Sequence, residues 1–325
     1  MKLPRKIKLN LGDLPLGETP MLVPSFSSRA NVNLTKTIDT VRESINGPIL
    51  LSAYDVYWAK LRPVKFPQLI FLDSGGYERS RDNDVSLLGF YKPSTRRWTR
   101  GMHKKCIEKW EKIPPTVVVS YDAPSIRESI QTQIKRAEDL FKEVKGVSRE
   151  ILVKPEAGKT KTVNLEAMKT NLEKLAQFDF LGITEKELGD SVLDRMVAIA
   201  EIRLAMEKFG IEQPIHVFGS LDPITTPLYY IAGADVFDGL SWLRFIIHKG
   251  AVYYADSYGP RKNGIHTNIN QTWGLMLASN LSYVTRLELN LRKFQPGEEY
   301  RHLGADADFF RNAREDLVGR IGRVI

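Results

Sequence analysis

Short apolar runs rich in β-branched residues recur along most of the chain, and longer amphipathic segments separate them. Nearly continuous hydrophobicity over a short run is typical of a strand that is covered on both faces, as in a parallel sheet. Runs of this kind lie at residues 19–26, 47–55, 67–73, 116–122, 150–156, 178–184, 214–220 and 234–240. They predict eight strands.

The segments between several of these runs have helical periodicity, most clearly at 34–45, 124–144, 164–177 and 189–210. Strands that alternate with helices in this way predict an α/β fold, a (β/α)8 barrel, with a doubly wound open sheet as the alternative. A long helix is expected at 266–294 and a short helical tail after it. We therefore expect a barrel over residues 1–260, with a basic insertion near 79–115, and C-terminal helices over 261–325 that pack on it.

Composition narrows the class of protein. Lys and Arg number 47 against 39 Asp and Glu, so the formal net charge is +8, which favours polyanionic partners. Cys106 is the single cysteine, which excludes a disulfide framework and a cysteine-rich zinc site. Without a long apolar run or a secretory signal pattern, the sequence predicts a cytoplasmic protein with no membrane partner.

Acidic residues stand at or near the ends of five of the apolar runs: Asp55, Asp73, Asp122, Glu156 and Asp238. The carboxyl ends of all strands of a (β/α)8 barrel surround one mouth, where active sites are built. Acids after strands also cap the following helices, which is the alternative interpretation. Gly-Gly follows Asp73, and Asp238 lies in a Phe-Asp-Gly-Leu sequence, so neither resembles an ordinary cap. The pattern favours acid/base or nucleophilic carboxylate chemistry.

The segment 91–105 joins the third and fourth predicted strands and is basic without an acidic residue. Arg96, Arg97 and Arg100 would neutralise phosphates, and Trp98 could stack on unpaired bases. A solvated loop that leads into a helix is the alternative. The clustering of charge with aromatic residues favours contact with nucleic acid.

In order along the chain, several motifs resemble those of the tRNA-guanine transglycosylase family, whose catalytic domain is a (β/α)8 barrel. They are DSGGY at 73–77, SYDAP at 120–124, ILVKPEAG at 151–158, FLGITEKELGD at 180–190 and the segment 216–244, which contains VFDGLSWLR. The resemblance covers roughly residues 19–250. Members of that family exchange guanine in a polynucleotide for a 7-deazaguanine base through a covalent aspartyl intermediate.

The resemblance implies roles for individual residues. Asp238 would be the nucleophile and Asp73 the general acid/base, and Arg244 would contact phosphate. The base would be bound by Tyr77, which stacks on it, by Asp122, which accepts from its N–H edge, and by Gly182, Ile183, Glu187 and Gly219. Glu156 stands in place of the family's glutamine.

The chain also departs from the family pattern. The usual zinc site, three cysteines and a histidine, is absent, so no cofactor is expected. The expected partners are tRNA or DNA and a guanine or 7-deazaguanine base (preQ0- or preQ1-like), and a homodimer is one assembly that the resemblance suggests. Two other hypotheses remain open: a non-catalytic, nucleic-acid-binding partner subunit of a transglycosylase, and an unrelated barrel glycosidase.

Overall fold

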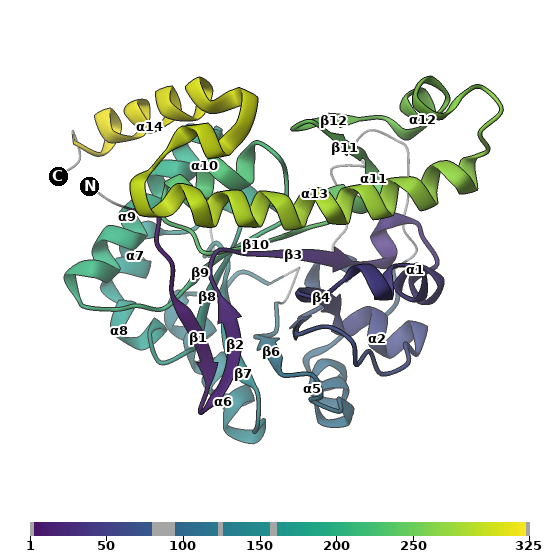
Figure 1. Cartoon of the computed structure of the whole chain (residues 1–325). Coiled ribbons are helices and arrows are strands. Elements are labelled where there is room, and N and C mark those ends of the chain that lie inside the picture. The colour runs from purple at the N-terminus through teal and green to yellow at the C-terminus, as the bar shows by residue number, and fades with distance from the viewer. Residues whose placement is uncertain (1–2, 80–94, 123–125, 157–160, 323–325) are drawn as a thin grey trace.

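The computed structural model describes residues 3–79, 95–122, 126–156 and 161–322. Eight parallel strands close into a barrel, in the order β10-β3-β4-β5-β6-β7-β8-β9 (Figure 1). The strands are β3 Met21–Phe26, β4 Pro48–Ser52, β5 Leu69–Asp73, β6 Thr116–Val119, β7 Ser148–Val153, β8 Phe180–Thr184, β9 Ile215–Phe218 and β10 Val236–Gly239. Each matches one of the eight predicted runs. The (β/α)8 prediction is confirmed, and the open-sheet alternative is wrong because β10 pairs with β3.

Helices follow the strands around the outside of the barrel. They are α1 Leu34–Val41, α2 Ala53–Ala59, α3 Gly76–Arg79, α5 Arg100–Lys109, α6 Ile130–Glu143, α7 Leu165–Thr170, α8 Leu172–Leu175, α9 Val192–Lys208, α10 Thr225–Ile231 and α11 Ser241–Arg244, with 3-10 turns at Ser28–Ala30, Arg42–Ser44, Glu185–Glu187 and Tyr300–Asp306. Local sequence sets several starts. Ser191 caps α9 in a capping box with Asp194, and Ser129 caps α6.

The strands build two hydrophobic clusters because successive side chains point to opposite faces. The larger cluster joins the outward side chains to the helices. The inner cluster fills the barrel and includes Phe71 and Phe180, whose rings meet edge to face at 5.6 Å. A hairpin, β1 Lys8–Leu11 and β2 Leu14–Glu18, adds Leu9 and Leu16 to the inner cluster. This hairpin was not predicted from the sequence.

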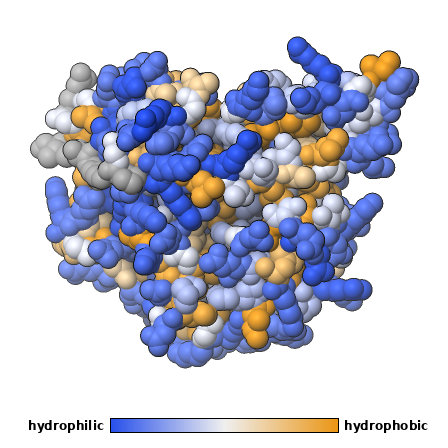
Figure 2. Space-filling model, in the orientation of Figure 1, coloured by the Kyte–Doolittle hydropathy of each residue, from blue (hydrophilic) through white to orange (hydrophobic). Residues whose placement is uncertain are grey.

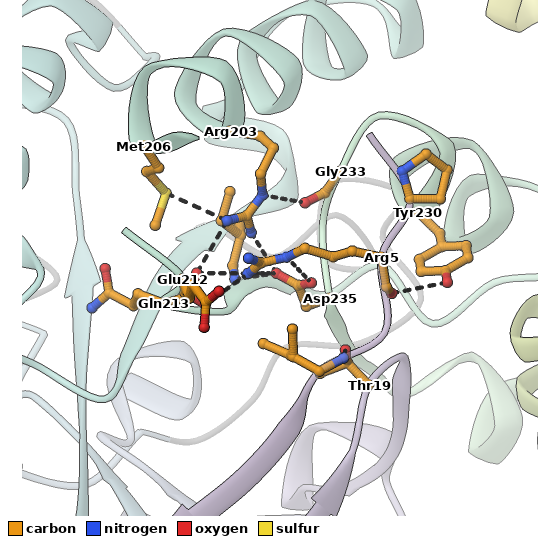
Figure 3. Close-up of polar contacts among 12 residues, drawn as sticks. Arg5, Thr19, Arg203, Met206, Glu212, Gln213, Tyr230, Gly233 and Asp235 are labelled. Carbon is orange, nitrogen blue, oxygen red and sulfur yellow. Dashed lines mark hydrogen bonds and ion pairs between the residues drawn. The ribbon is translucent and has the colours of Figure 1, made fainter. Parts of the chain in front are cut away.

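Asp235, the residue before β10, fixes the start of that strand (Figure 3). Its carboxylate accepts from Arg203 and from Nε of Arg5 at 2.8 Å, and from the backbone N–H of Ile215 at 2.8 Å. The Asp235 and Arg203 side chains are fully buried. This ion-pair network connects α9, β9 and the start of β10. Asp235 lies three residues before Asp238 in sequence, so the network also helps to fix the position of Asp238.

The C-terminal region packs along one side of the barrel. It contains β11 Ile246–His248, β12 Ala251–Tyr253, α12 Ala255–Asn263, α13 Ile269–Gly297 and α14 Ala307–Ile321. The predicted long helix is α13, which runs above β3 and β10 in the view of Figure 1. Glu288 on α13 accepts from the N–H of Leu22 in β3 at 3.0 Å. The β11–β12 hairpin and α12 were not predicted.

The face drawn in Figure 2 is mainly hydrophilic, with hydrophobic residues scattered over it in small groups. Over the described ranges, no helix combines the length and the apolar character that crossing a membrane requires.

Candidate active site

Asp73 and Asp238 lie at the carboxyl ends of β5 and β10, at the mouth of the barrel. Asp73 is the last residue of β5, and Asp238 is followed in β10 only by Gly239. Both side chains are buried. Asp55, by contrast, lies in the first turn of α2, three residues beyond the end of β4, where its carboxylate accepts from the N–H of Ser28 at 2.8 Å.

The environment of Asp73 favours its protonated form. Burial raises the pKa of Asp73, and the negative charges of Glu78 and Asp238 raise it further. Backbone N–H groups oppose them: that of Gly75, which lies 3.0 Å from Oδ2, and that of Ser74 lower the pKa. A carboxyl group that keeps its proton near neutral pH can act as a general acid.

Glu78 on α3 is a buried acid of the mouth that the sequence analysis missed. Its two oxygens accept from Ser27 Oγ at 2.5 Å and Ser52 Oγ at 2.6 Å. The Glu78 charge contributes to raising the pKa of Asp73 and, after burial, that of Asp55. Glu78 follows a turn and does not stand at the end of an apolar run, so the pattern that identified the strand-end acids does not include it.

Asp238 has an oriented carboxylate. Oδ2 accepts from Ser25 Oγ at 2.7 Å, and Oδ1 accepts from the backbone N–H of Gly219 at 2.9 Å. Nε2 of His216 lies 3.4 Å from the same Oδ1. Gly219 has a φ of +83°, which a glycine adopts without strain. Its observed role is thus to hold Asp238.

Glycines shape the turn between Asp73 and Tyr77. Gly75 has a φ of +85°, and a Cβ atom there would lie 2.7 Å from Cβ of Tyr54 and 2.8 Å from Nε1 of Trp98. A Cβ atom on Gly76 would lie 2.5 Å from Oδ2 of Asp122. At each of the two positions, a different neighbouring side chain leaves no room for a Cβ atom.

Tyr77 stands at the rim with two arginines around it. Tyr77 is 38% exposed, and its hydroxyl accepts from Arg244 at 3.0 Å. The Arg29 guanidinium lies 5.6 Å from the ring centre. This arrangement gives an accessible aromatic surface next to positive charge.

Asp122 belongs to a charged cluster whose centre is Lys154, a residue that the sequence analysis did not select. Nζ of Lys154 lies 2.7 Å from Glu187 and 3.7 Å from Asp122, and it bonds Thr184 Oγ1 at 2.9 Å. Burial by itself lowers the pKa of Lys154, but the two carboxylates outweigh it and raise the pKa. Lys154 is thus a fixed cation between two predicted base-binding acids.

Glu156 has a different position from the one expected. Its Oε1 accepts from the N–H of Ile130 at the start of α6, at 2.9 Å, and its Oε2 accepts from Asn164 at 2.8 Å. Glu156 therefore caps a helix, which is the alternative interpretation of an acid that follows a strand. Lys154, two residues earlier, is the residue of this segment that meets Asp122.

Gly182 and Ile183 lie inside β8 and not at its end. Both pair with β7 on one side and β9 on the other, and Thr184 ends the strand. Ile183 packs in the outer cluster. This placement gives the two residues a structural role, in contrast to the expected backbone contacts with a base.

The described part of the basic segment begins at residue 95, and residues 91–94 lie outside the described residues. Arg96, Arg97 and Arg100 are exposed. Trp98 is only 4% exposed, and its Nε1 donates to the carbonyl of Ser74 at 2.8 Å. The prediction that Trp98 stacks on bases is therefore wrong, since its ring packs under the turn that follows β5.

Within the described ranges, no cluster of three or more His, Cys, Asp or Glu side chains is arranged to hold a metal ion. No family model matches the chain, and no curated protein has significant sequence similarity to it.

Proposed function

We propose that the protein is a nucleic-acid guanine transglycosylase, a pentosyltransferase that exchanges guanine for a 7-deazaguanine base in tRNA or DNA. The observation that carries this proposal is the pair of buried carboxylates at the barrel mouth, Asp73 and Asp238, whose environments differ. Asp238 accepts two hydrogen bonds and has Nε2 of His216 3.4 Å from its Oδ1, whereas the pKa of Asp73 is raised by burial and by neighbouring acids. Two carboxyl groups with separate duties are what glycosyl transfer requires.

In the proposed reaction, an oxygen of Asp238 attacks the anomeric carbon C1′ of the ribose or deoxyribose. The C1′–N9 bond breaks, its electron pair leaves with guanine, and Asp73 supplies the proton that neutralises the leaving base. The incoming base then gives a proton to the Asp73 carboxylate and attacks C1′. Asp238 leaves as a carboxylate, so both acids return to their starting forms.

The surroundings of the pair fit a purine. Tyr77 offers an exposed ring for stacking, and Asp122 and Glu187 offer acceptors for ring N–H and amino groups. Lys154 adds a donor that suits an exocyclic carbonyl oxygen. A target nucleotide must leave its stack to reach such a site.

The nucleic-acid part of the proposal rests on charge. The exposed Arg96, Arg97 and Arg100 form a basic strip on the chain segment that packs under the turn after β5. The overall charge of +8 points the same way.

The test is incorporation of radiolabelled guanine and 7-cyano-7-deazaguanine into tRNA, duplex DNA and single-stranded DNA, with Asp238→Asn as the control. Label that depends on Asp238 supports the proposal, and the polymer that takes it identifies the substrate. Binding without label in any polymer would overturn it and favour the non-catalytic partner subunit.

A further inference from the structure

Three titratable side chains form a line inside the barrel. They come from β7, β9 and β10, and β8 lies between the first two of these strands. Oε1 of Glu150 on β7 lies 2.8 Å from Nδ1 of His216 on β9, and Nε2 of His216 lies 3.4 Å from Oδ1 of Asp238 on β10. Glu150 and His216 are fully buried, and Asp238 is 6% exposed. Water is therefore excluded from the contact between Glu150 and His216.

The intervening strand β8 leaves room for this line. Gly182 lies between β7 and β9, in register with His216. A Cβ atom on Gly182 would lie 2.8 Å from Oε1 of Glu150 and 2.7 Å from the ring of Phe218. Any side chain at position 182 would push the Glu150 carboxylate or the Phe218 ring out of place.

Aromatic rings fix the His216 imidazole. Phe218 stacks on it with ring centres 3.9 Å apart, and Phe71 meets it edge to face at 5.2 Å. The titratable groups that face it are Glu150 from β7 and Asp238 from β10, while β5 and β9 present only the two phenyl rings. The imidazole thus has one orientation, with a carboxylate at each nitrogen.

We propose that Glu150 and His216 are positioning residues for Asp238, in which an imidazolium donates from Nδ1 to Glu150 and holds its positively charged Nε2 side 3.4 Å from Oδ1 of Asp238. This inference rests on the proposed function, because it assigns to the pair the control of the nucleophile of that reaction. It adds two residues to the mechanism that the sequence analysis did not select.

Electrostatics supports a charged imidazole. Burial by itself lowers the pKa of His216, but Glu150 first and then Asp238 outweigh burial and raise the pKa to about 9. Burial also raises the pKa of Glu150, and the contact with His216 opposes this.

The arrangement distinguishes the two oxygens of Asp238. Oδ1 accepts from the Gly219 N–H and faces His216, whereas Oδ2, among the residues that the structure describes, accepts only from the hydroxyl of Ser25. Oδ2 is therefore the oxygen that forms the bond to C1′, and Oδ1 becomes the ester carbonyl. When the incoming base attacks C1′, the electron pair of the C1′–Oδ2 bond returns to Asp238, and the imidazolium stabilises the departing carboxylate.

The first measurement is a pH titration of the histidine ring nitrogens of the intact protein by ¹⁵N NMR. His216 should stay protonated well above its ordinary pKa of 6.5. In Glu150→Gln its midpoint should fall by about 1 to 3 pH units, because one opposite charge is lost. Ser148→Ala, on the same strand, is the matched control and should leave the midpoint unchanged. His103 is an internal reference that stays neutral, since burial and then Arg100 lower its pKa to about 3.

A wild-type midpoint near 6.5, or one that Glu150→Gln does not move, would overturn the inference whether or not the protein exchanges bases. The titration needs no polynucleotide, so it separates this inference from the proposed function.

The second measurement concerns the covalent protein–polynucleotide complex, trapped without incoming base. Release by added base should slow on the order of 10²-fold in Glu150→Gln. An unchanged release rate would overturn the positioning role. If the wild type forms no complex at all, the proposed function has failed, and the positioning role falls with it, because there is then no nucleophile for the pair to orient.

Discussion

A Cβ atom placed on Gly76 would lie 2.5 Å from Oδ2 of Asp122, closer than real Cβ atoms approach any neighbour. The turn after β5 and the segment after β6 therefore fit together only because residue 76 is a glycine. Because residue 76 has no Cβ atom, the Asp122 carboxylate can occupy the space next to it. Part of the DSGGY motif is thus explained by packing against a predicted base-binding acid.

Gly76→Ala should displace Asp122 and cost about 1–3 kcal/mol of stability, because the added methyl group overfills a packed site. Base binding should weaken more than stability alone explains. Urea unfolding and calorimetric titration with guanine measure the two effects. Gly101→Ala is the matched control: that glycine lies in α5 with open space around it, so alanine should stabilise by about 0.5–1 kcal/mol. Unchanged base affinity in Gly76→Ala would contradict the assignment of Asp122.

Asp73 should make the protein less stable as pH rises. Its pKa is raised from 3.8 to about 8 in the folded state, so between these values the folded protein binds more protons than the unfolded chain. The free energy of unfolding therefore falls across that window. Asp73→Asn removes this pH dependence. The free energy of unfolding of the variant minus that of the wild type should therefore be larger at about pH 8 than at about pH 5, by at least about 1.4 kcal/mol. It should also abolish base exchange.

Urea unfolding of wild type and Asp73→Asn at both pH values measures this. Asp194→Asn is the control. A hydrogen bond from Ser191 lowers the pKa of Asp194 from 3.8, so its contribution is lost only as pH falls below that unfolded value and should not change between about pH 5 and about pH 8. An Asp73→Asn effect that is independent of pH would contradict the protonated state assigned to Asp73.

Asp235→Asn should destabilise the protein by about 3–5 kcal/mol, because it leaves buried Arg203 without its counterion. The start of β10 would loosen, and with it the position of Asp238. Urea unfolding measures the loss. Glu111→Gln is the control, since its ion pair with Lys65 is exposed and should contribute less than about 1 kcal/mol. Equal effects of the two substitutions would contradict a special role for the buried network.

The barrel was predictable because each of its strands is covered on both faces, which leaves a nearly continuous apolar run. The β11–β12 hairpin lacks that signal: all three residues of β12 are exposed, so neither burial nor alternation marks it. The carboxylates at the mouth were predictable for a related reason. Asp73 and Asp238 belong to the strands themselves, so the position of the strand fixes the position of the acid.

Other parts of the site depend on contacts between distant residues, which the local sequence pattern does not reveal. Glu156 and Lys154 have the same parity along the chain, but β7 ends at Val153, and beyond a strand the alternation of side chains no longer holds. Only the fold shows that Lys154 turns toward Asp122. His216 is a lone histidine in an apolar strand, for which packing is the usual explanation. Its role depends on Glu150, a residue 66 positions away in sequence.

Arg97→Gln should reduce the salt dependence of polynucleotide binding. If Arg97 contacts one phosphate, the slope of log affinity against log salt concentration should become shallower by about 0.7–0.9. Arg311→Gln is the control, because Arg311 is also exposed but lies on α14, in the C-terminal helices. Fluorescence anisotropy over a salt series measures both slopes. Equal slopes in wild type and Arg97→Gln would exclude Arg97 from the binding surface.

Lys154→Met should weaken recognition of the incoming base more than it slows the chemical steps. The ammonium group lies 2.7 Å from Glu187 and 3.7 Å from Asp122, and its removal takes this cation from both acids, while Arg127 remains 3.6 Å from Glu187. Without the ammonium group, the mutual repulsion of the two carboxylates is less well offset, so they are held less firmly as acceptors for the N–H edge of a purine. We expect the KM for the base to rise about tenfold, which corresponds to about 1.4 kcal/mol, with a smaller change in kcat.

Initial rates of label exchange over a range of base concentrations separate these two parameters. The chain supplies a closely matched control in Lys169, which also bridges two acids, Glu166 and Glu201, at 2.7 Å each. It does so between α7 and α9, away from the mouth, so Lys169→Met should leave KM and kcat unchanged. If Lys154→Met lowered kcat and left KM unaltered, Lys154 would act on the reacting centre and not on the base, and the assignment of Asp122 and Glu187 as base acceptors would fall with it.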